Sequence, residues 1–122
     1  MTKTYLFVCV ENSCRSQIAE AFARMFGAEA FSTGSRPSGV VNPKAIASMA
    51  ELGYDMSGHE SSAHVPDCEF AAVIAMGCGD SCPPVRTQRI IEWDIPDPKE
   101  MDTASFARVR DRIRDEVVQL IA

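Results

Sequence analysis

The chain has 122 residues, a length that fits one domain with a real hydrophobic core. Hydrophobic residues make up 46% of the sequence and charged residues 24%, as in ordinary globular proteins. The formal net charge of -5 argues against a general binder of nucleic acid or of acidic membranes. Any anionic ligand would therefore have to be bound by a local device.

Neither secretion nor membrane insertion is predicted. The apolar stretch TYLFVCV, residues 4–10, is short, follows a single lysine and leads into polar residues without a typical cleavage site. No apolar run approaches the roughly 20 residues of a transmembrane helix. We therefore expect a cytoplasmic protein that has no membrane partner.

Cysteine is the residue type that first suggests chemistry. The five cysteines are Cys9, Cys14, Cys68, Cys78 and Cys82. An odd number in a reducing compartment argues against a disulfide framework. Thiol chemistry, metal binding and simple burial remain as explanations.

The first half of the chain predicts two strands and two helices. Residues 4–10 form a continuous apolar run, as in a parallel strand buried on both faces. The next segment has an apolar face at helical spacing, formed by Ile18, Phe22, Met25 and Phe26. Residues 29–33, EAFST, predict a second strand. Asn42, Pro43 and Gly53 are typical of the N-cap, the first position and the end of a second helix.

The second half predicts two more strands and a long helix. FAAVIAM, residues 70–76, and TQRIIEW, residues 87–93, are the expected strands, and Asp102 or Thr103 caps the helix. The helix has an apolar stripe made by Phe106, Val109, Ile113, Val117 and Leu120. Its other faces should be solvated, and they carry Arg108, Arg110, Asp111, Arg112, Arg114 and Asp115.

This alternation of strands and helices predicts βαβ units and an α/β fold. We expect a single domain over residues 1–122, a three-layer αβα sandwich around a four-stranded parallel sheet. Ligands of such sheets bind beyond the carboxyl ends of the strands. Cys9, Cys78 and Asp97 each follow a predicted strand, so all three should share one rim of the sheet.

Cys9 and Arg15 stand at the two ends of a C-x5-R segment between a strand and a helix start. Backbone N–H groups in such a loop can form an anion nest, and the helix N-terminus adds positive partial charge. Arg15 can hold two oxygens of a tetrahedral oxyanion, and Ser16 can donate a hydrogen bond to a Cys9 thiolate. Glu11 is out of place in an anion loop, and we expect it to face solvent. The alternative is a structural Cys9 with Arg15 in a surface ion pair.

The stretch CVENSCRSQIAEAF, residues 9–22, resembles the active-site loop of low-molecular-weight protein tyrosine phosphatases and of the arsenate reductases built on their fold. The resemblance extends from Tyr5 to about Asp102. It implies that Cys9 is the nucleophile, that Arg15 binds the oxyanion and that Asp97 is an acid or hydrogen-bonding group. A turn residue before proline is the plainer reading of Asp97. The implied substrate-binding residues are Val10, Glu11, Asn12, Ser13, Cys14, Arg15 and Ser16.

Four features resemble the reductase branch. Gln17 stands where the phosphatases have proline, and STGSRPSGVVNPKAIASM, residues 32–49, has the reductases' Asn-Pro and lacks the phosphatases' aromatic residue. Asp97-Pro98 is followed by Lys99 rather than tyrosine. Most telling is MGCGDSCPP, residues 76–84, which places Cys78 and Cys82 in a glycine-rich loop.

The reductase resemblance implies a thiol relay. Cys9 attacks arsenate, Cys78 then attacks Cys9 as arsenite leaves, and Cys82 takes over the disulfide for an external donor. That donor is thioredoxin, glutaredoxin with a small thiol, or mycothiol. Phosphate and sulfate are possible substrate analogues, and no cofactor is expected. The short C-x3-C spacing leaves the order of attack by Cys78 and Cys82 open. The alternative to arsenate reduction is hydrolysis of phosphotyrosine or aryl phosphates through a Cys9 phosphoenzyme.

Several other residues have weaker predictions. Asn12 and Ser32 match positions that brace the loop, and Glu20 matches a residue of a potassium site in some reductases, although GHESSAH, residues 58–64, does not match that site. His59 and His64 are expected to be structural, as is Cys68, while Cys14 is either supporting or merely small. A zinc module would need a second cysteine pair beside Cys78 and Cys82, so no metal is expected. A thiol-based oxyanion sensor without turnover is the third alternative.

Overall fold

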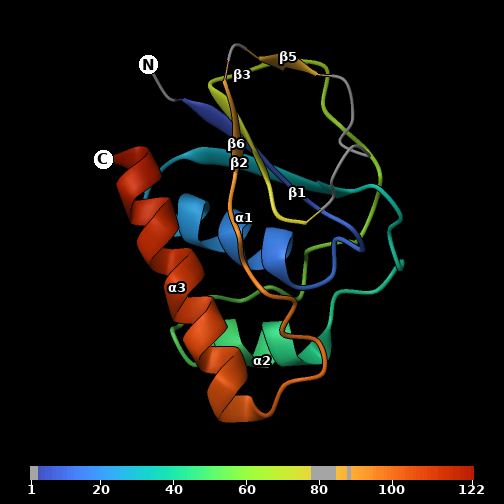
Figure 1. Ribbon diagram of the computed structural model, residues 1–122, viewed down its shortest axis with the longest axis vertical. Coiled ribbons are helices and arrows are strands. Elements are labelled where there is room, and N and C mark those ends of the chain that lie inside the picture. The colour runs from blue at the N-terminus through green and yellow to red at the C-terminus, as the bar shows by residue number, and fades with distance from the viewer. Residues whose placement is uncertain (1–2, 78–84, 88) are drawn as a thin grey trace.

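The computed structural model describes residues 3–77, 85–87 and 89–122. Its centre is a parallel sheet in the order β2-β1-β4-β6 (Figure 1). The strands are β1 (Thr4–Cys9), β2 (Glu29–Gly34), β4 (Ala72–Ala75) and β6 (Ile90–Glu92). β1 lies between β2 and β4, and its last residue, Cys9, pairs with Gly34. This confirms the expected α/β fold with a four-stranded parallel sheet, and it brings Cys9 to the carboxyl edge.

Three helices surround one face of the sheet: α1 (Arg15–Met25), α2 (Pro43–Ala50) and α3 (Thr103–Ile121). Two begin at the caps that the sequence predicts. The Asn42 side chain accepts a hydrogen bond from Lys44 N at 2.9 Å, and the Asp102 side chain accepts one from Ser105 N at 2.7 Å. Among the described residues, no helix is both long enough and apolar enough to cross a membrane.

Alternate residues of β1 point into two separate apolar clusters, as the strand geometry requires. Tyr5 and Phe7 belong to the larger cluster, which contains the apolar faces of all three helices. Leu6 and Val8 belong to the smaller one on the opposite face. Every residue from Tyr5 to Cys9 is buried, as expected for a strand covered on both sides.

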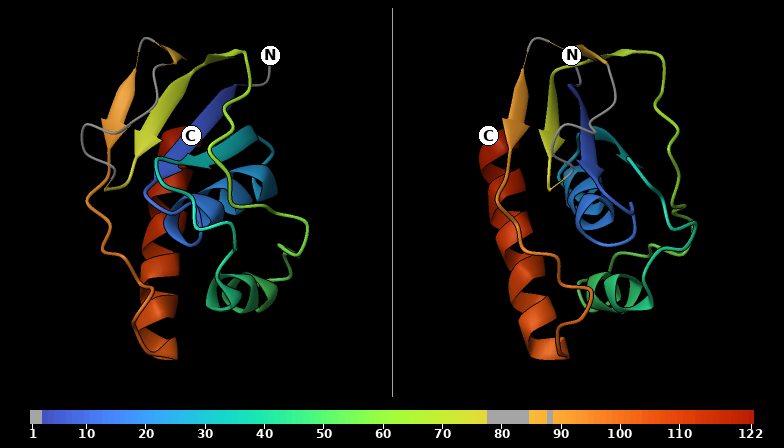
Figure 2. Two further views of the ribbon diagram at one scale, coloured as in Figure 1. Left: turned by 90° about the vertical axis from the view of Figure 1, so that its right-hand side faces the viewer. Right: turned by 45° about the vertical axis from the view of Figure 1, so that its right-hand side comes forward.

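The smaller cluster is closed by a layer of extended chain. A two-stranded sheet of β3 (Glu69–Phe70) and β5 (Arg86–Thr87) lies there, and Val65 and Cys68 pack against the cluster. Figure 2 shows this segment and α3 on opposite sides of the main sheet. The described part of the third layer is therefore β and extended chain where the sandwich prediction has helices.

The small sheet also corrects two predicted strands. FAAVIAM is divided, because Phe70 pairs in β3 whereas Ala72–Ala75 form β4 of the main sheet. TQRIIEW is divided in the same way between β5 and β6. A continuous apolar run does not show where a strand changes its pairing partner. The two breaks, in residues 70–76 and 87–93, therefore could not be predicted from the sequence.

Arg110 corrects another prediction, because the sequence places it on the solvated side of the last helix. Its side chain is buried and donates to the Ser48 carbonyl oxygen at 2.9 Å and to the Glu51 carboxylate at 2.9 Å. The long stem of arginine lets the guanidinium reach α2 from the edge of the apolar stripe. Arg110 thereby joins α3 to α2.

Gly34 allows β2 and the loop after β1 to approach closely. A Cβ atom at this position would lie 2.8 Å from the Val10 carbonyl oxygen and 2.9 Å from the Asn12 Cβ. Both neighbours are fixed parts of the loop, so neither can move away cheaply.

We expect Gly34→Ala to lower the free energy of unfolding by about 1–3 kcal/mol, because the added methyl group overpacks a rigid contact. Urea denaturation would measure the loss. Gly58→Ala is the matched control, because nothing lies within 4 Å of its Cβ position. Equal stability of the two variants would contradict the tight packing at Gly34.

Candidate active site

The loop between β1 and α1 turns all its carbonyl groups outward. The oxygens of six successive residues, Cys9 to Cys14, accept hydrogen bonds from outside the turn. The donors in chain order are Ser35 N, Arg36 N, Ser38 N with Ser61 Oγ, Gln17 Nε2, Asn42 N and Ile18 N. Since each peptide unit is planar, an outward carbonyl directs the next N–H inward. The concave side of the loop is therefore the expected anion nest.

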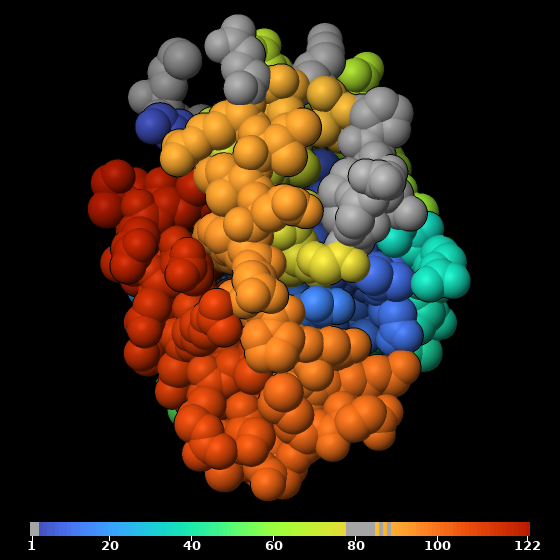
Figure 3. Space-filling model, viewed as in Figure 1, coloured from blue at the N-terminus to red at the C-terminus, as the bar shows by residue number. Residues whose placement is uncertain are grey.

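A pocket of about 180 Å³ opens on this concave side. It is lined by Cys9, Val10, Glu11, Ser13, Cys14, Arg15 and Asp97. The structure thus brings the predicted nucleophile, the predicted arginine and the predicted acid to one cavity. Figure 3 shows the orange segment that follows β6 lying against the blue N-terminal loop and helix. Asp97 reaches the pocket from this segment.

Cys9 is 3% exposed and lies at the end of β1. Its Sγ is 2.9 Å from Ser16 Oγ, which accepts a hydrogen bond from Asn12 Nδ2 at 2.8 Å. Because Asn12 supplies a proton to the hydroxyl, the proton of Ser16 itself is free to be donated to sulfur. Ser16 is therefore placed to donate a hydrogen bond to the Cys9 sulfur.

Asn12 holds the loop together. Its backbone is left-handed, with φ 52, a conformation that asparagine tolerates better than most residues. Its side-chain oxygen accepts a hydrogen bond from Ser62 N at 3.0 Å, while its amide donates to Ser16. The prediction that Asn12 braces the loop agrees with these contacts. Ser32 lies elsewhere, because its hydroxyl donates to the Glu20 carboxylate at 2.6 Å.

A chain of buried polar groups continues from the loop to Tyr54. Gln17 Nε2 donates to the carbonyl oxygens of Asn12 and Glu60, so Gln17 Oε1 is the acceptor that faces His59 Nδ1 at 2.9 Å. The neutral imidazole therefore carries its proton on Nδ1. Its Nε2 accepts from the Tyr54 hydroxyl at 2.8 Å.

Arg15 is fixed from two directions. Its Nη1 donates to the Ile95 carbonyl oxygen at 3.0 Å. Gly77 lies against the guanidinium, and a Cβ there would be 2.7 Å from Nη1. Gly77 also has a φ of 86°, a backbone conformation that residues with a side chain rarely adopt. The predicted anion-binding arginine is therefore held at the pocket without a carboxylate partner among its described hydrogen bonds.

Cys14 also lines the pocket, and burial determines the state of its thiol. Burial raises the pKa of Cys14 to about 11, although the Ser13 hydroxyl opposes the effect. The thiol is therefore protonated near neutral pH and is a poor nucleophile. Cys68 packs beside the smaller apolar cluster, as a structural residue would. Cys78 and Cys82 lie outside the described residues.

Glu11 is partly exposed, and its carboxylate has a partner that the sequence does not predict. Its side chain is 33% exposed and forms an ion pair with Lys99. In the sequence, Lys99 stands out only because it replaces the tyrosine of the phosphatases. The feature of the sequence that could have revealed this ion pair is Glu11 itself. An acid in an anion-binding loop needs a cation from elsewhere in the chain to neutralise it. Likewise, Glu20 contacts Arg24 at 3.0 Å as well as Ser32.

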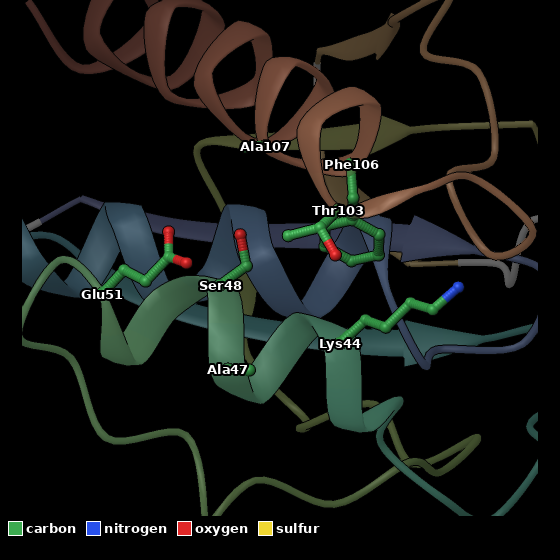
Figure 4. A pocket seen from close by; sticks show the side chains of 7 residues that line it. All are labelled: Lys44, Ala47, Ser48, Glu51, Thr103, Phe106 and Ala107. Carbon is green, nitrogen blue, oxygen red and sulfur yellow. The ribbon is translucent and has the colours of Figure 1, made fainter.

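A second pocket, of about 100 Å³, lies between α2 and α3 (Figure 4). It is lined by Lys44, Ala47, Ser48, Glu51, Thr103, Phe106 and Ala107. None of the residues predicted for catalysis or anion binding reaches it. The loop pocket is therefore the candidate active site.

The protonated state of Cys14 predicts selective alkylation. We expect iodoacetamide near pH ~8 to modify Cys9 and to leave Cys14 largely unmodified, although both thiols line one pocket. Mass spectrometry of tryptic peptides would follow each site, with Cys14→Ala as the control for assignment. Modification of Cys14 should increase as the pH rises toward its pKa of about 11. Equal rates at both sites would contradict the protonated state of Cys14.

His59 predicts a pH-dependent stability. Burial lowers the pKa of His59 below its ordinary value of 6.5, while the Glu20 carboxylate, with its oxygen 3.6 Å from Nδ1, opposes the shift. Arg24 lowers this pKa further and Asp55 raises it. Below pH 6.5 the unfolded chain therefore binds more protons than the folded chain at this site. Protonation of His59 would also place a proton on Nε2, which could then no longer accept the hydrogen bond from the Tyr54 hydroxyl.

We expect His59 to contribute no pH dependence above its unfolded pKa and to reduce the free energy of unfolding as the pH falls below it. His59→Gln should flatten this dependence in urea denaturation between about pH 7 and pH 5. His64→Gln is the matched control, because His64 is the other histidine and is exposed. A slope unchanged in His59→Gln would contradict the lowered pKa.

Several known proteins resemble this chain in sequence and in fold. Glutaredoxin arsenate reductase from Synechocystis sp. is 40% identical over 127 aligned residues, covering 98% of this chain and 97% of that protein. A solved structure described as an arsenate reductase in the phosphate-binding state has a TM-score of 0.88 and 37% identity, covering 98% of this chain and 97% of the other.

A thioredoxin-dependent arsenate reductase from Corynebacterium glutamicum has a TM-score of 0.76 and 29% identity, covering 99% of this chain and 64% of that chain. The description "Low molecular weight phosphotyrosine protein phosphatase" belongs to the family that matches residues 4–122. On this match and on the relatives aligned along nearly its whole length, the chain belongs to the low molecular weight phosphotyrosine protein phosphatase family.

Proposed function

We propose that this chain is an arsenate reductase that binds arsenate in the loop of residues 9–16. One observation carries the proposal: Cys9 Sγ contacts a hydroxyl donor at the base of a pocket that Arg15 also lines. A thiolate in an anion-binding cavity is positioned to attack the central atom of a tetrahedral oxyanion. The relatives that cover nearly the whole chain carry arsenate reductase names, which favours arsenic as that atom.

The proposed first step is attack of Cys9 sulfur on arsenate. A sulfur–arsenic bond forms and one arsenate oxygen leaves as water after protonation. Asp97 lines the pocket and is the proposed proton donor or hydrogen-bonding group for that oxygen. Arg15 and the inward N–H groups are the proposed binding groups for the remaining oxygens.

The proposed second step transfers two electrons. The Cys78 thiolate attacks Cys9 sulfur, a disulfide forms, and the electron pair of the sulfur–arsenic bond leaves with arsenic as arsenite. Cys82 then attacks Cys78, which frees Cys9 and leaves a Cys78–Cys82 disulfide. The order of the two later cysteines is part of this proposal and rests on the sequence alone.

An external dithiol or a small thiol must then reduce the disulfide. The relatives' names include both glutaredoxin and thioredoxin, so both are candidate donors. The proposed setting is the cytoplasm, where such donors keep thiols reduced. We further propose that residues 1–122 form one domain, because the larger apolar cluster contains residues of β1 and all three helices.

The second candidate is a phosphatase for phosphotyrosine or aryl phosphates. It is favoured by the family description and by the pocket that Asp97 and Cys9 both line, since a phosphoenzyme needs the same nucleophile and acid. Unlike the reductase, a phosphatase would not consume thiols.

Fully reduced protein mixed with arsenate, without any donor, separates these candidates. We expect two thiols to be lost for each arsenite released, with Cys78 found in a disulfide by mass spectrometry. Cys9→Ser should abolish the release, because an alcohol is a far weaker nucleophile than a thiolate. Cys68→Ser is the matched control, and it should retain turnover because Cys68 packs beside the smaller cluster.

Brisk, Cys9-dependent hydrolysis of aryl phosphate without thiol loss or arsenite would sink the reductase proposal. Arsenite that forms only after a small thiol is added would instead place the second sulfur outside the protein and overturn the internal relay.

A further inference from the structure

An acidic residue stands at the mouth of the proposed oxyanion pocket. Glu11 lines the cavity together with Cys9 and Arg15, and its side chain is 33% exposed. Unpaired, the carboxylate would repel an arsenate or phosphate dianion at short range, where water and salt screen least. A pocket that binds such anions therefore needs this charge to be cancelled.

Lys99 supplies the cancelling charge. Its Nζ lies 3.0 and 3.1 Å from the two carboxylate oxygens of Glu11. The hydrogen bond to Glu11 raises the pKa of Lys99, and Asp97 and Glu100 raise it further, so the ammonium stays charged. Glu11 and Lys99 are 88 residues apart in sequence, and the pair links the anion loop to the segment that carries Asp97.

The backbone beside Lys99 is held in place. Lys44 extends from α2 (Figure 4) and donates to the carbonyl oxygens of Lys99 at 3.2 Å and Met101 at 3.0 Å. Lys99 N also donates to Asp97 Oδ1 at 3.1 Å. Lys99 therefore reaches Glu11 from a fixed base, which lowers the entropic cost that weakens most exposed ion pairs.

We propose that Lys99 is a positioning residue for oxyanion binding, which acts by neutralising Glu11 at the rim of the pocket. This rests on the proposed function, because it takes a tetrahedral oxyanion as the ligand of the loop. The pair makes the affinity for the anion depend on two charges of opposite effect. Lys99 favours anion binding and Glu11 opposes it. An ordinary surface ion pair would leave the affinity for the anion unchanged.

The test uses inorganic phosphate as the probe and needs no turnover. Phosphate in the loop should protect Cys9 from iodoacetamide, so its apparent Kd follows from the alkylation rate of Cys9 at increasing phosphate. At low ionic strength we expect Lys99→Met to raise this Kd about three- to tenfold and Glu11→Gln to lower it by a similar factor. The double variant should return close to the unsubstituted protein, and Lys99→Arg should retain most of the affinity.

Lys3→Met is the matched control. Lys3 is exposed and precedes β1, whereas Cys9 ends that strand, so the substitution removes the same charge far from the pocket. It should change the Kd less than about twofold, and about 0.5 M NaCl should shrink all these differences. In arsenate turnover, Lys99→Met should raise KM more than it lowers kcat.

Equal effects of Lys99→Met and Lys3→Met, or a double variant as weak as Lys99→Met, would overturn the proposal. Phosphate that failed to protect Cys9 in the unsubstituted protein would overturn the oxyanion site and this proposal together. Protection with the expected charge pattern, but without arsenite from arsenate, would support Lys99 and reject only the reductase chemistry.

Discussion

The carbonyl oxygens of Cys9 to Cys14 all accept hydrogen bonds from outside their own turn, and the proposed chemistry depends on this. An inward carbonyl would put a negative partial charge against an oxyanion. The loop is kept in this conformation by its neighbours. Residues 35–42 supply four of the donors, and Gly34 lets that segment approach closely enough to reach them. The anion site is therefore a product of packing between β2 and the loop, as well as of the loop's own sequence.

The proposed nucleophile, Cys9, depends on a second set of contacts. Ser16 can donate its proton to Cys9 because the Asn12 amide donates a hydrogen bond to the Ser16 hydroxyl oxygen. The Asn12 side chain in turn accepts a hydrogen bond from Ser62 N. Gln17 links the same loop to His59 through a buried amide. Removing one member would leave buried groups unsatisfied, which costs more than the net gain from an average hydrogen bond. The orientation of Ser16 thus depends on the Asn12 side chain and, through it, on Ser62.

Much of this was predictable from the sequence, because it is local. Cys9, Arg15 and Ser16 lie within eight residues, and the caps Asn42 and Asp102 act within three residues of their partners. Contacts of long sequence separation could not be predicted. Arg15 meets the Ile95 carbonyl 80 residues away, and Arg110 meets Ser48 62 residues away. The division of the apolar strands was also hidden, because pairing partners are chosen in space and leave periodicity unchanged.

The position of Lys99 explains how an acidic chain can hold an anionic substrate. With a net charge of -5, the long-range field of the protein is unfavourable to arsenate. At physiological salt, however, exposed charges beyond roughly 8 Å are largely screened, so the groups around the pocket dominate. Arg15 lines the pocket, whereas the charge of Lys99 is neutralised by its ion pair with Glu11. In the proposed function, binding therefore falls mainly to Arg15 and the inward N–H groups, which would recognise the shape of a small tetrahedral oxyanion as well as its charge.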